Sequence, residues 1–269
     1  MTACKLCGGA TAPFGELTML GRHRAQFQRC TACGYAFVEN PTWLDEAYAD
    51  HAIAALDTGI AKRNLWLADA VDALLRWRFR GVRTALDYGA GTGLFVRLMR
   101  DRGHDFRWSD PHCENLFALG FEADANARFD LATCFEVAEH LTDPLPVFRE
   151  LTQRAPILIF TTELLPERNN RPGEWHYYTP ETGQHVGFFT TDSLRTLAKR
   201  LDRHFASDGR MLHVFTAEPL DPRWLRIVAK QRRARRLLKL LRKRPPLTWS
   251  DAETLTQALR RQQSESAHS

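Results

Sequence analysis

Residues 84–93 read Thr84-Ala85-Leu86-Asp87-Tyr88-Gly89-Ala90-Gly91-Thr92-Gly93, and the apolar-rich run 94–99 follows them. This order of residue types predicts a short buried strand, a glycine-rich turn and a helix. Three alternating glycines let the backbone turn tightly and approach a ligand without an intervening Cβ. The helix begins with unpaired N–H groups that face the turn, and such a helix end favours an anion or carboxylate.

A second acidic residue supports a ligand site at this turn. Arg107-Trp108-Ser109-Asp110-Pro111 ends the next expected strand, and Asp110 follows Asp87 by 23 residues. In open α/β sheets, an acid at the end of the second strand binds the ribose hydroxyls of a nucleotide-like ligand. The glycines lack the G-x-G-x-x-G spacing of dinucleotide-binding proteins, which argues against an oxidoreductase.

An apolar run, an acid and G-x-G-x-G in this order resemble the first motif of the class I S-adenosylmethionine (SAM) methyltransferases. The resemblance implies that the glycine turn holds the amino-acid end of SAM and that Asp110 binds its ribose. A turn that binds no ligand is the alternative. We expect the cofactor contacts to come from the turn and from the ends of the neighbouring strands: Asp87, Gly89, Ala90, Gly91, Gly93, Asp110, Pro111, Phe135 and Glu136.

Strands that alternate with helices predict an α/β fold with a Rossmann-like sheet, and the resemblance implies the seven-stranded methyltransferase sheet. The third strand of this sheet is poorly defined in the sequence, because residues 116–124 show little alternation of apolar and polar residues. Helical periodicity between 45 and 80, which includes Ala52 and Ala55 and is interrupted near 57–59, predicts a connector before the sheet. We expect the other elements to be strands at 84–87, 105–109, 129–134 and 157–161, a helix at 191–201 and a closing hairpin that turns at 207–209.

Four of the six cysteines form two C-x-x-C-G pairs near the N-terminus. Cys4 and Cys7 are separated from Cys30 and Cys33 by 22 residues, which is close to the spacing of structural zinc sites. Four thiolates complete a tetrahedral shell, so we expect a structural Zn²⁺ rather than a catalytic one. Four reduced, buried thiols without a metal are the alternative. A segment of about 40 residues buries little core, so the metal would supply much of its folding free energy.

Three histidines are candidate catalytic residues, since the pKa of histidine lies near the working pH. His140 follows the fourth strand in the run 135–141 (FEVAEHL), which looks like the same region of many small-molecule methyltransferases. His176 and His185 lie in the aromatic-rich segment 174–189, whose W-x-Y-Y and G-Q-H runs are similar to a segment of bacterial methyltransferases of glycan pathways. His185 is our first candidate for a base or acceptor ligand. Packing roles for the histidines and the aromatic side chains are the alternative.

The net charge of +5 is unevenly distributed along the chain. Between Asp221 and Arg244, eleven Lys or Arg residues accompany one acid, so this segment carries +10 and the rest of the chain about −5. We expect one amphipathic basic helix at 223–244, a further helix at 249–261 and disorder over 262–269. The basic helix could pack on the acidic body, lie on an anionic membrane or bind nucleic acid.

These features divide the chain into a zinc-binding module (1–40), a helical connector or cap (41–82), a SAM methyltransferase domain (83–219) and a basic helical tail (220–269). We expect a methyltransferase that acts on a small-molecule or glycan acceptor, with a sugar hydroxyl in polysaccharide biosynthesis as the first candidate. An RNA methyltransferase and a non-catalytic SAM-fold scaffold are the alternatives.

The expected location is the cytoplasm. No apolar run approaches the ~20 residues of a membrane helix, and no signal-peptide pattern leads into the first cysteine pair. If the basic helix binds anionic lipid, the enzyme would lie at the inner face of the membrane.

Overall fold

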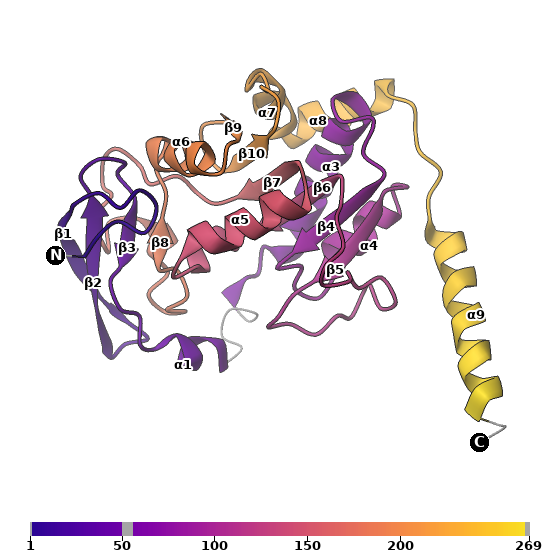
Figure 1. The fold of residues 1–269 in the computed structure, drawn as a ribbon, viewed down its shortest axis with the longest axis horizontal. Coiled ribbons are helices and arrows are strands. Elements are labelled where there is room, and N and C mark those ends of the chain that lie inside the picture. Colours follow the sequence, from indigo (N-terminus) through magenta and orange to yellow (C-terminus); the bar gives the residue numbers. More distant parts are fainter. Residues whose placement is uncertain (1, 50–55, 267–269) are drawn as a thin grey trace.

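The computed structural model describes residues 2–49 and 56–266, which contain two β-sheets (Figure 1). The larger sheet contains β4 (Thr84–Tyr88), β5 (Asp105–Ser109), β6 (Leu131–Phe135), β7 (Ile157–Thr161), β9 (His204–Ser207) and β10 (Leu212–Thr216). The smaller sheet contains β1 (Thr11–Met19), β2 (His23–Cys30), β3 (Ala36–Val38) and β8 (Gly187–Phe188). The helices are α1 (Leu44–Ala49), α3 (Ile60–Trp77), α4 (Leu94–Arg100), α5 (Pro144–Arg154), α6 (Thr191–Arg200), α7 (Arg223–Val228), α8 (Gln231–Leu240) and α9 (Thr248–Ser266), with short 3₁₀ turns η1 (Ala138–His140) and η2 (His176–Tyr178).

The larger sheet has the strand order β5-β4-β6-β7-β10-β9. β4 pairs in parallel with β5 and β6, and β6 with β7, whereas β10 runs antiparallel to β7 and β9. The expected strands 105–109 and 157–161 match β5 and β7 residue for residue. The chain first crosses from β4 to β5 on one side and later reaches β6 on the other. The switch point, where ligands bind in such sheets, therefore lies at the carboxyl end of β4.

The expected seventh strand is not formed in the described part of the chain. An isolated parallel bridge between Trp108 and Glu122 is what continues the sheet beyond β5. The physical reason lies in 116–124, because Leu116, Phe117 and Leu119 are each more than half exposed. A strand on this sheet would instead bury alternate side chains on the helical layers.

Helices cover both faces of the larger sheet, so its central strands are buried on both sides. Alternate residues of β4 and β6 point to opposite layers. Ala85 and Leu131 pack with α3, α4, α7 and α8, whereas Leu86 and Ala132 pack with α5 and α6. This double burial explains why the central strands read as apolar runs.

The smaller sheet combines the N-terminal segment with a strand from the distant segment 174–189. β1 and β2 form a hairpin, β2 pairs with β3, and β3 pairs with β8 through Ala36–Phe188 and Phe37–Gly187. Tyr178 and Phe188 are fully buried in the core of this sheet. Most aromatic side chains of 174–189 are thus core residues, which agrees with the packing alternative for this segment.

The single basic helix expected at 223–244 is two helices, α7 and α8, because the chain turns at Ala229-Lys230. The Trp66 indole N–H on α3 donates to the Ala229 carbonyl (2.8 Å), and Trp77 lies edge-on to Trp224 with ring centroids 4.0 Å apart. The charged run 230–236 has a group of apolar residues before it and another after it. One straight helix could not place both groups on the same face. The turn lets both groups pack on α3.

Helix α9 projects from the body of the molecule and is yellow in Figure 1. Asp251 anchors its first turn through the guanidinium groups of Arg97 and Arg100. All residues of α9 after Leu255 are exposed. The helix includes 262–266, which we expected to be disordered, while 267–269 lie outside the described residues.

The connector consists of α1 and α3. Ala52 and Ala55, which contributed to its expected apolar faces, lie outside the described residues. None of the described helices is long and apolar enough to cross a membrane.

Candidate active site at the carboxyl edge of the larger sheet

The glycine turn connects β4 to α4 at the carboxyl end of the central strand. Gly89, Gly91 and Gly93 have φ values of +68°, +54° and +85°, a conformation that favours glycine. A Cβ on Gly89 would lie 2.3 Å from Cγ2 of Val137, whereas a Cβ on Gly91 would meet no atom within 4 Å. The Ala90 N–H is taken up by the Ser109 carbonyl (3.2 Å). The turn is therefore closed beneath Gly89 and accessible above Gly91.

Asp110 fastens this turn to the end of β5. Its Oδ2 accepts a hydrogen bond from the Gly91 N–H (2.8 Å), and its Oδ1 accepts from the N–H groups of His112 and Cys113 (2.8 and 2.9 Å). Pro111 is exposed beside it. A carboxylate oxygen can accept two hydrogen bonds, so Oδ2 keeps a lone pair for a ligand hydroxyl.

Asp87 lies beneath the turn rather than in the ligand space. It is 3% exposed, and its Oδ1 accepts a hydrogen bond from the Thr133 hydroxyl (2.6 Å). Burial, helped by the charge of Asp110, raises the pKa of Asp87 to about 7. Asp87 thus supports the turn through β6, and its contact with the cofactor stays a prediction.

Phe135 and Glu136 follow β6 on the other side of the turn. Phe135 packs edge-to-face on Phe95, with ring centroids 5.0 Å apart. Glu136 has a φ of +54°, which is uncommon for a side chain other than glycine and is typical of functional sites. Its N–H donates to Oγ1 of Thr161 (3.0 Å). Burial, followed by the charge of Glu139, raises the pKa of Glu136 to about 7.

Beyond Glu136, η1 brings Glu139 and His140 to His185 from the distant segment. One ligand atom from each of these three side chains lies within 4.8 Å of the other two. The rings of His140 and His185 lie 4.9 Å apart, edge to face. Burial raises the pKa of Glu139 and lowers the pKa of both histidines, so both rings are neutral near pH 7.

Hydrogen bonds from Tyr177 hold this cluster in place. The carbonyl oxygen of Tyr177 lies 2.6 Å from Nδ1 of His185. Since a carbonyl only accepts, Nδ1 carries the ring proton and Nε2 keeps its lone pair. The Tyr177 hydroxyl donates to Oε1 of Glu139 (2.6 Å). One residue therefore sets the orientation of a histidine and a carboxylate.

Gly183 and Gln184 anchor the connector over the cluster. The Trp43 indole N–H donates to the Gly183 carbonyl, and the Gln184 amide donates to the Ala47 carbonyl, both at 2.8 Å. These bonds fix α1, whose Tyr48 hydroxyl lies 3.3 Å from Nδ1 of His140. The Gly-Gln-His run thus contains two anchors and one residue that faces the site.

Residues 60–202 match a protein family described as a methyltransferase domain. The match covers more than half of the chain and includes the glycine turn, Asp110 and the Glu139-His140 pair. The chain belongs to this methyltransferase family.

Several solved structures resemble this methyltransferase in part of its chain. TnmH matches with 21% identity and a TM-score of 0.47 over 66% of this chain and 62% of TnmH. An O-methyltransferase family protein from Burkholderia thailandensis matches with 12% identity and a TM-score of 0.49 over 66% and 63%. The plantazolicin methyltransferase BpumL in complex with SAH matches with 9% identity and a TM-score of 0.48 over 66% and 95%. This chain therefore spans less than two thirds of the first two proteins. No protein of curated function matches its sequence significantly.

His176 does not join the other two candidate histidines of the methyltransferase. Its side chain is 74% exposed, and its Nε2 lies 3.1 Å from Oε2 of Glu163. The structure therefore separates His176, at the surface, from the buried cluster that contains His185.

Tyr48, His112 and Arg63 lie near the cluster and were not expected there from the sequence. Tyr48 stacks on His112 with ring centroids 5.1 Å apart. The guanidinium of Arg63, held by Asp57 (3.0 Å), opposes the rise in the pKa of Glu136 through its charge. Since these residues lie on separate elements, no motif or spacing in the sequence links them to the cluster.

The four N-terminal cysteines of the methyltransferase form a second candidate site. All four sulfur atoms lie within 4.8 Å of one another, and no disulfide joins them. Sγ of Cys4 lies 3.7 Å from Sγ of Cys33, and Sγ of Cys7 lies 3.5 Å from Sγ of Cys30. Sulfur atoms around a tetrahedral zinc, with Zn–S bonds of about 2.3 Å, lie about 3.8 Å apart. The arrangement therefore fits one Zn²⁺.

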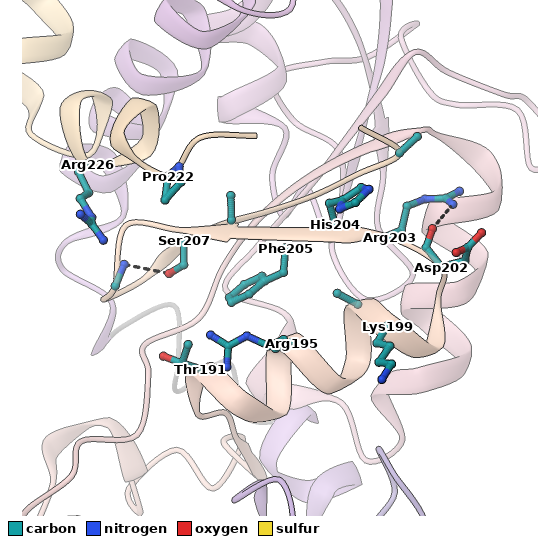
Figure 2. Close-up of a pocket in the computed structure, with 14 residues that line it drawn as sticks. Thr191, Arg195, Lys199, Asp202, Arg203, His204, Phe205, Ser207, Pro222 and Arg226 are labelled. Atoms are coloured by element: carbon teal, nitrogen blue, oxygen red, sulfur yellow. Dashed lines mark hydrogen bonds between the residues drawn. The ribbon is translucent and has the colours of Figure 1, made fainter. Parts of the chain in front are cut away.

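A groove with a volume of about 630 Å³ lies along the edge strand β9, between α6 and α7 (Figure 2). Figure 2 shows Arg195 and Lys199 of α6 on one side, Arg226 of α7 on the other and Phe205 between them. None of the expected cofactor, catalytic or metal residues lines this groove. The groove is therefore separate from the predicted site residues at the carboxyl edge of the larger sheet.

Proposed function

We propose that this methyltransferase methylates a hydroxyl of a small-molecule or glycan-linked acceptor, with a sugar hydroxyl in polysaccharide or related biosynthesis as the preferred substrate. One observation carries the proposal: neutral His185 keeps an unprotonated Nε2 in a buried cluster that follows β6, beside the cofactor turn. A hydroxyl acceptor needs such a proton acceptor during transfer.

The glycine turn and Asp110 fit the cofactor. SAM, when bound, supplies an electrophilic methyl group on a positively charged sulfur. The free N–H groups at the start of α4 suit its carboxylate. The remaining lone pair on Oδ2 of Asp110 suits a ribose hydroxyl. Gly91 leaves space for the ligand, because a Cβ would occupy the accessible side of the turn.

His185 acts on the acceptor. Its Nε2 accepts the hydroxyl proton while the acceptor oxygen bonds to the methyl carbon and the bond from that carbon to sulfur breaks. Tyr177 keeps the ring in the orientation that this step needs. The connector, anchored through Gln184, would align the acceptor and so reduce the entropic part of the barrier.

The preference for a sugar hydroxyl has two supports. The W-x-Y-Y and G-Q-H runs resemble those of glycan-pathway methyltransferases. In addition, Tyr48, Glu136 and Glu139 supply hydroxyl and carboxyl groups around His140 and His185. Several such groups can form hydrogen bonds with a polyol, which carries several hydroxyls.

Calorimetric titration with S-adenosylhomocysteine tests the cofactor site. We expect micromolar binding by the wild type and at least about tenfold weaker binding by Asp110→Ala, because a hydrogen bond to a charged group is lost. His204→Ala, at an exposed position on β9, is the control and should bind as the wild type does. A folded wild-type protein that does not bind would contradict the proposal.

Methylation assays with nucleotide sugars and lipid-linked glycans test the acceptor. Loss of a general base lowers turnover about 10²- to 10⁴-fold, so we expect this loss in His185→Ala with unchanged S-adenosylhomocysteine binding. Equal turnover by His185→Ala and His204→Ala would exclude His185 as the base.

For the N-terminal module, we propose that Cys4, Cys7, Cys30 and Cys33 hold one structural Zn²⁺. The sulfur distances support this proposal, and four protein ligands leave no open position for catalysis. Metal analysis of the purified protein should find zinc that Cys30→Ser loses. Retention of that zinc by the variant would contradict the assignment.

For the tail, we propose peripheral contact with anionic lipid at the cytoplasmic face of a membrane. Arg232, Arg233, Arg236 and Lys239 are exposed on α8 and form no ion pair with the described residues. Each such cation near an anionic surface contributes about 1 kcal/mol. Sedimentation with phosphatidylserine vesicles should therefore exceed that with neutral vesicles and decrease with salt. Equal sedimentation with both vesicles would oppose the proposal.

A further inference from the structure

Two buried carboxylate oxygens after β6 have no hydrogen bond of normal geometry among the described residues, and neither does the Thr162 hydroxyl, which lowers the pKa of Glu139. The two oxygens are Oε1 of Glu136 and Oε2 of Glu139. Glu139 is fully buried, and its other oxygen accepts a hydrogen bond from the Tyr177 hydroxyl. Burying a carboxylate oxygen without a donor or cation is strongly unfavourable. A native protein that keeps such an oxygen therefore points to a bound ligand, ion or water.

The histidines beside Glu139 each use one ring nitrogen and leave the other free. Nδ1 of His185 donates to the Tyr177 carbonyl (2.6 Å), and Nδ1 of His140 lies 3.3 Å from the Tyr48 hydroxyl. Metal-binding histidines commonly donate their second ring N–H to a carbonyl or a similar acceptor, which fixes the tautomer. Nε2 of His185, one ring nitrogen of His140 and Oε2 of Glu139 have the character of a ligand set.

We propose that Glu139, His140 and His185 bind one divalent transition-metal ion, separate from the site formed by the four cysteines. Their candidate ligand atoms lie within 4.8 Å of one another. Nitrogen and oxygen ligands that each lie about 2.1 Å from a tetrahedral ion are about 3.4 Å from one another. The ligand atoms of the three side chains would therefore have to approach one another by at most about 1.4 Å to bind an ion. Side-chain rotation can supply this movement.

The ligand types indicate which ions fit. Two imidazoles and one carboxylate suit Zn²⁺, Co²⁺ or Fe²⁺, whereas Mg²⁺ and Ca²⁺ prefer oxygen ligands throughout. Three protein ligands leave at least one position open for a substrate oxygen. His140 is only partly buried, so the ion can be reached from the exposed side of its ring.

The effect of this ion on catalysis rests on the proposed function. The ion would make an acceptor hydroxyl on the open position more acidic, so that the hydroxyl proton would pass to solvent water while the oxygen bonds to the methyl carbon of the cofactor. Nε2 of His185 would serve as a ligand while the ion is bound, and it serves as the proton acceptor of the proposed function while the ion is absent. Binding of the ion itself depends only on the three side chains and can be measured without cofactor or acceptor.

Cobalt titration of the full-length, zinc-loaded protein tests the proposal. We expect a second metal equivalent whose d–d absorption lacks thiolate charge-transfer bands, because its ligands are nitrogen and oxygen. Glu139→Gln, His140→Ala and His185→Ala should each lose this equivalent, whereas His204→Ala should keep it. S-adenosylhomocysteine binding by each variant confirms that the larger sheet is folded.

The outcomes separate this inference from the proposed function. A wild type that binds cobalt only with thiolate character, or folded variants that all keep the second equivalent, would overturn the ion site and leave the methyl-transfer proposal intact. A second equivalent that disappears in the three variants supports the ion site, even if no hydroxyl acceptor is methylated.

Discussion

Buried carboxyl groups make the stability of this methyltransferase depend on pH. Burial raises the pKa of Asp87, Glu136 and Glu139, which lie within or just after two adjacent strands. Unfolding would return these groups to pKa values of about 4. The folded state therefore retains protons that the unfolded state releases between about pH 4 and 7, and stability falls with rising pH across this window.

Asp87→Asn should remove one part of this dependence. The pKa of Asp87 is about 7 in the folded protein, which is above its value in the unfolded chain. The contribution of Asp87 to the free energy of unfolding therefore becomes more unfavourable as the pH rises to 7 and is constant above pH 7. We expect the variant to gain stability relative to the wild type by up to about 1.4 kcal/mol per pH unit between pH 4 and 7. Urea unfolding at several pH values measures the difference, and parallel profiles for the two proteins would contradict it.

At the scale of elements, the start of α6 connects the methyltransferase domain to the cysteine pairs. Oγ1 of Thr190 accepts a hydrogen bond from the Ser193 N–H (3.1 Å) and donates to the Cys33 carbonyl (2.9 Å). Oγ of Ser193 accepts from the Thr190 N–H (2.8 Å), which completes a capping box. One hydroxyl therefore both begins a helix and holds the second cysteine turn.

Thr190→Ala should destabilise the protein by about 1–2 kcal/mol, because it removes the helix cap and the bond to Cys33. Thr190→Ser keeps the hydroxyl and should recover most of this loss. Urea unfolding of both variants provides the measurement. Equal destabilisation by Ala and Ser would show that the methyl group, and not the hydroxyl, is what matters.

Local sequence patterns predicted the positions of strands and helices better than they predicted which elements contact one another. Apolar runs located β5 and β7 to the residue, and glycine spacing located the turn above β4. The same patterns could not show that Phe188 pairs with Ala36, or that α8 turns back on α3 at Ala229, because these depend on contacts between distant residues. In the site, histidine chemistry identified His140 and His185. The position of Tyr48 depends on the bond from Gln184 and could not be inferred.

At the scale of the whole molecule, the smaller sheet supports the catalytic segment. His185 precedes β8 by two residues, and β8 is held by β3, which follows the second cysteine pair. The glycine turn, in contrast, belongs to the larger sheet. Disturbing the cysteine site should therefore affect the acceptor side of the active site more than the cofactor side.

Cys30→Ser is expected to show this separation. We expect acceptor turnover to fall with the loss of zinc, while S-adenosylhomocysteine affinity stays within about twofold of the wild type, because the glycine turn belongs to the larger sheet. Calorimetry and a turnover assay on the same preparation measure the two effects. A parallel loss of both would mean that the two sheets fold as a single cooperative unit.

The pairing of β3 with β8 also has a consequence for synthesis on the ribosome. The two strands are separated by about 150 residues, which take roughly 8–30 s to translate. During this interval the nascent N-terminal sheet lacks its fourth strand, and β3 presents an unpaired edge that can associate with other chains. Chains arrested just before and just after β8 emerges should therefore differ in protease sensitivity at β3.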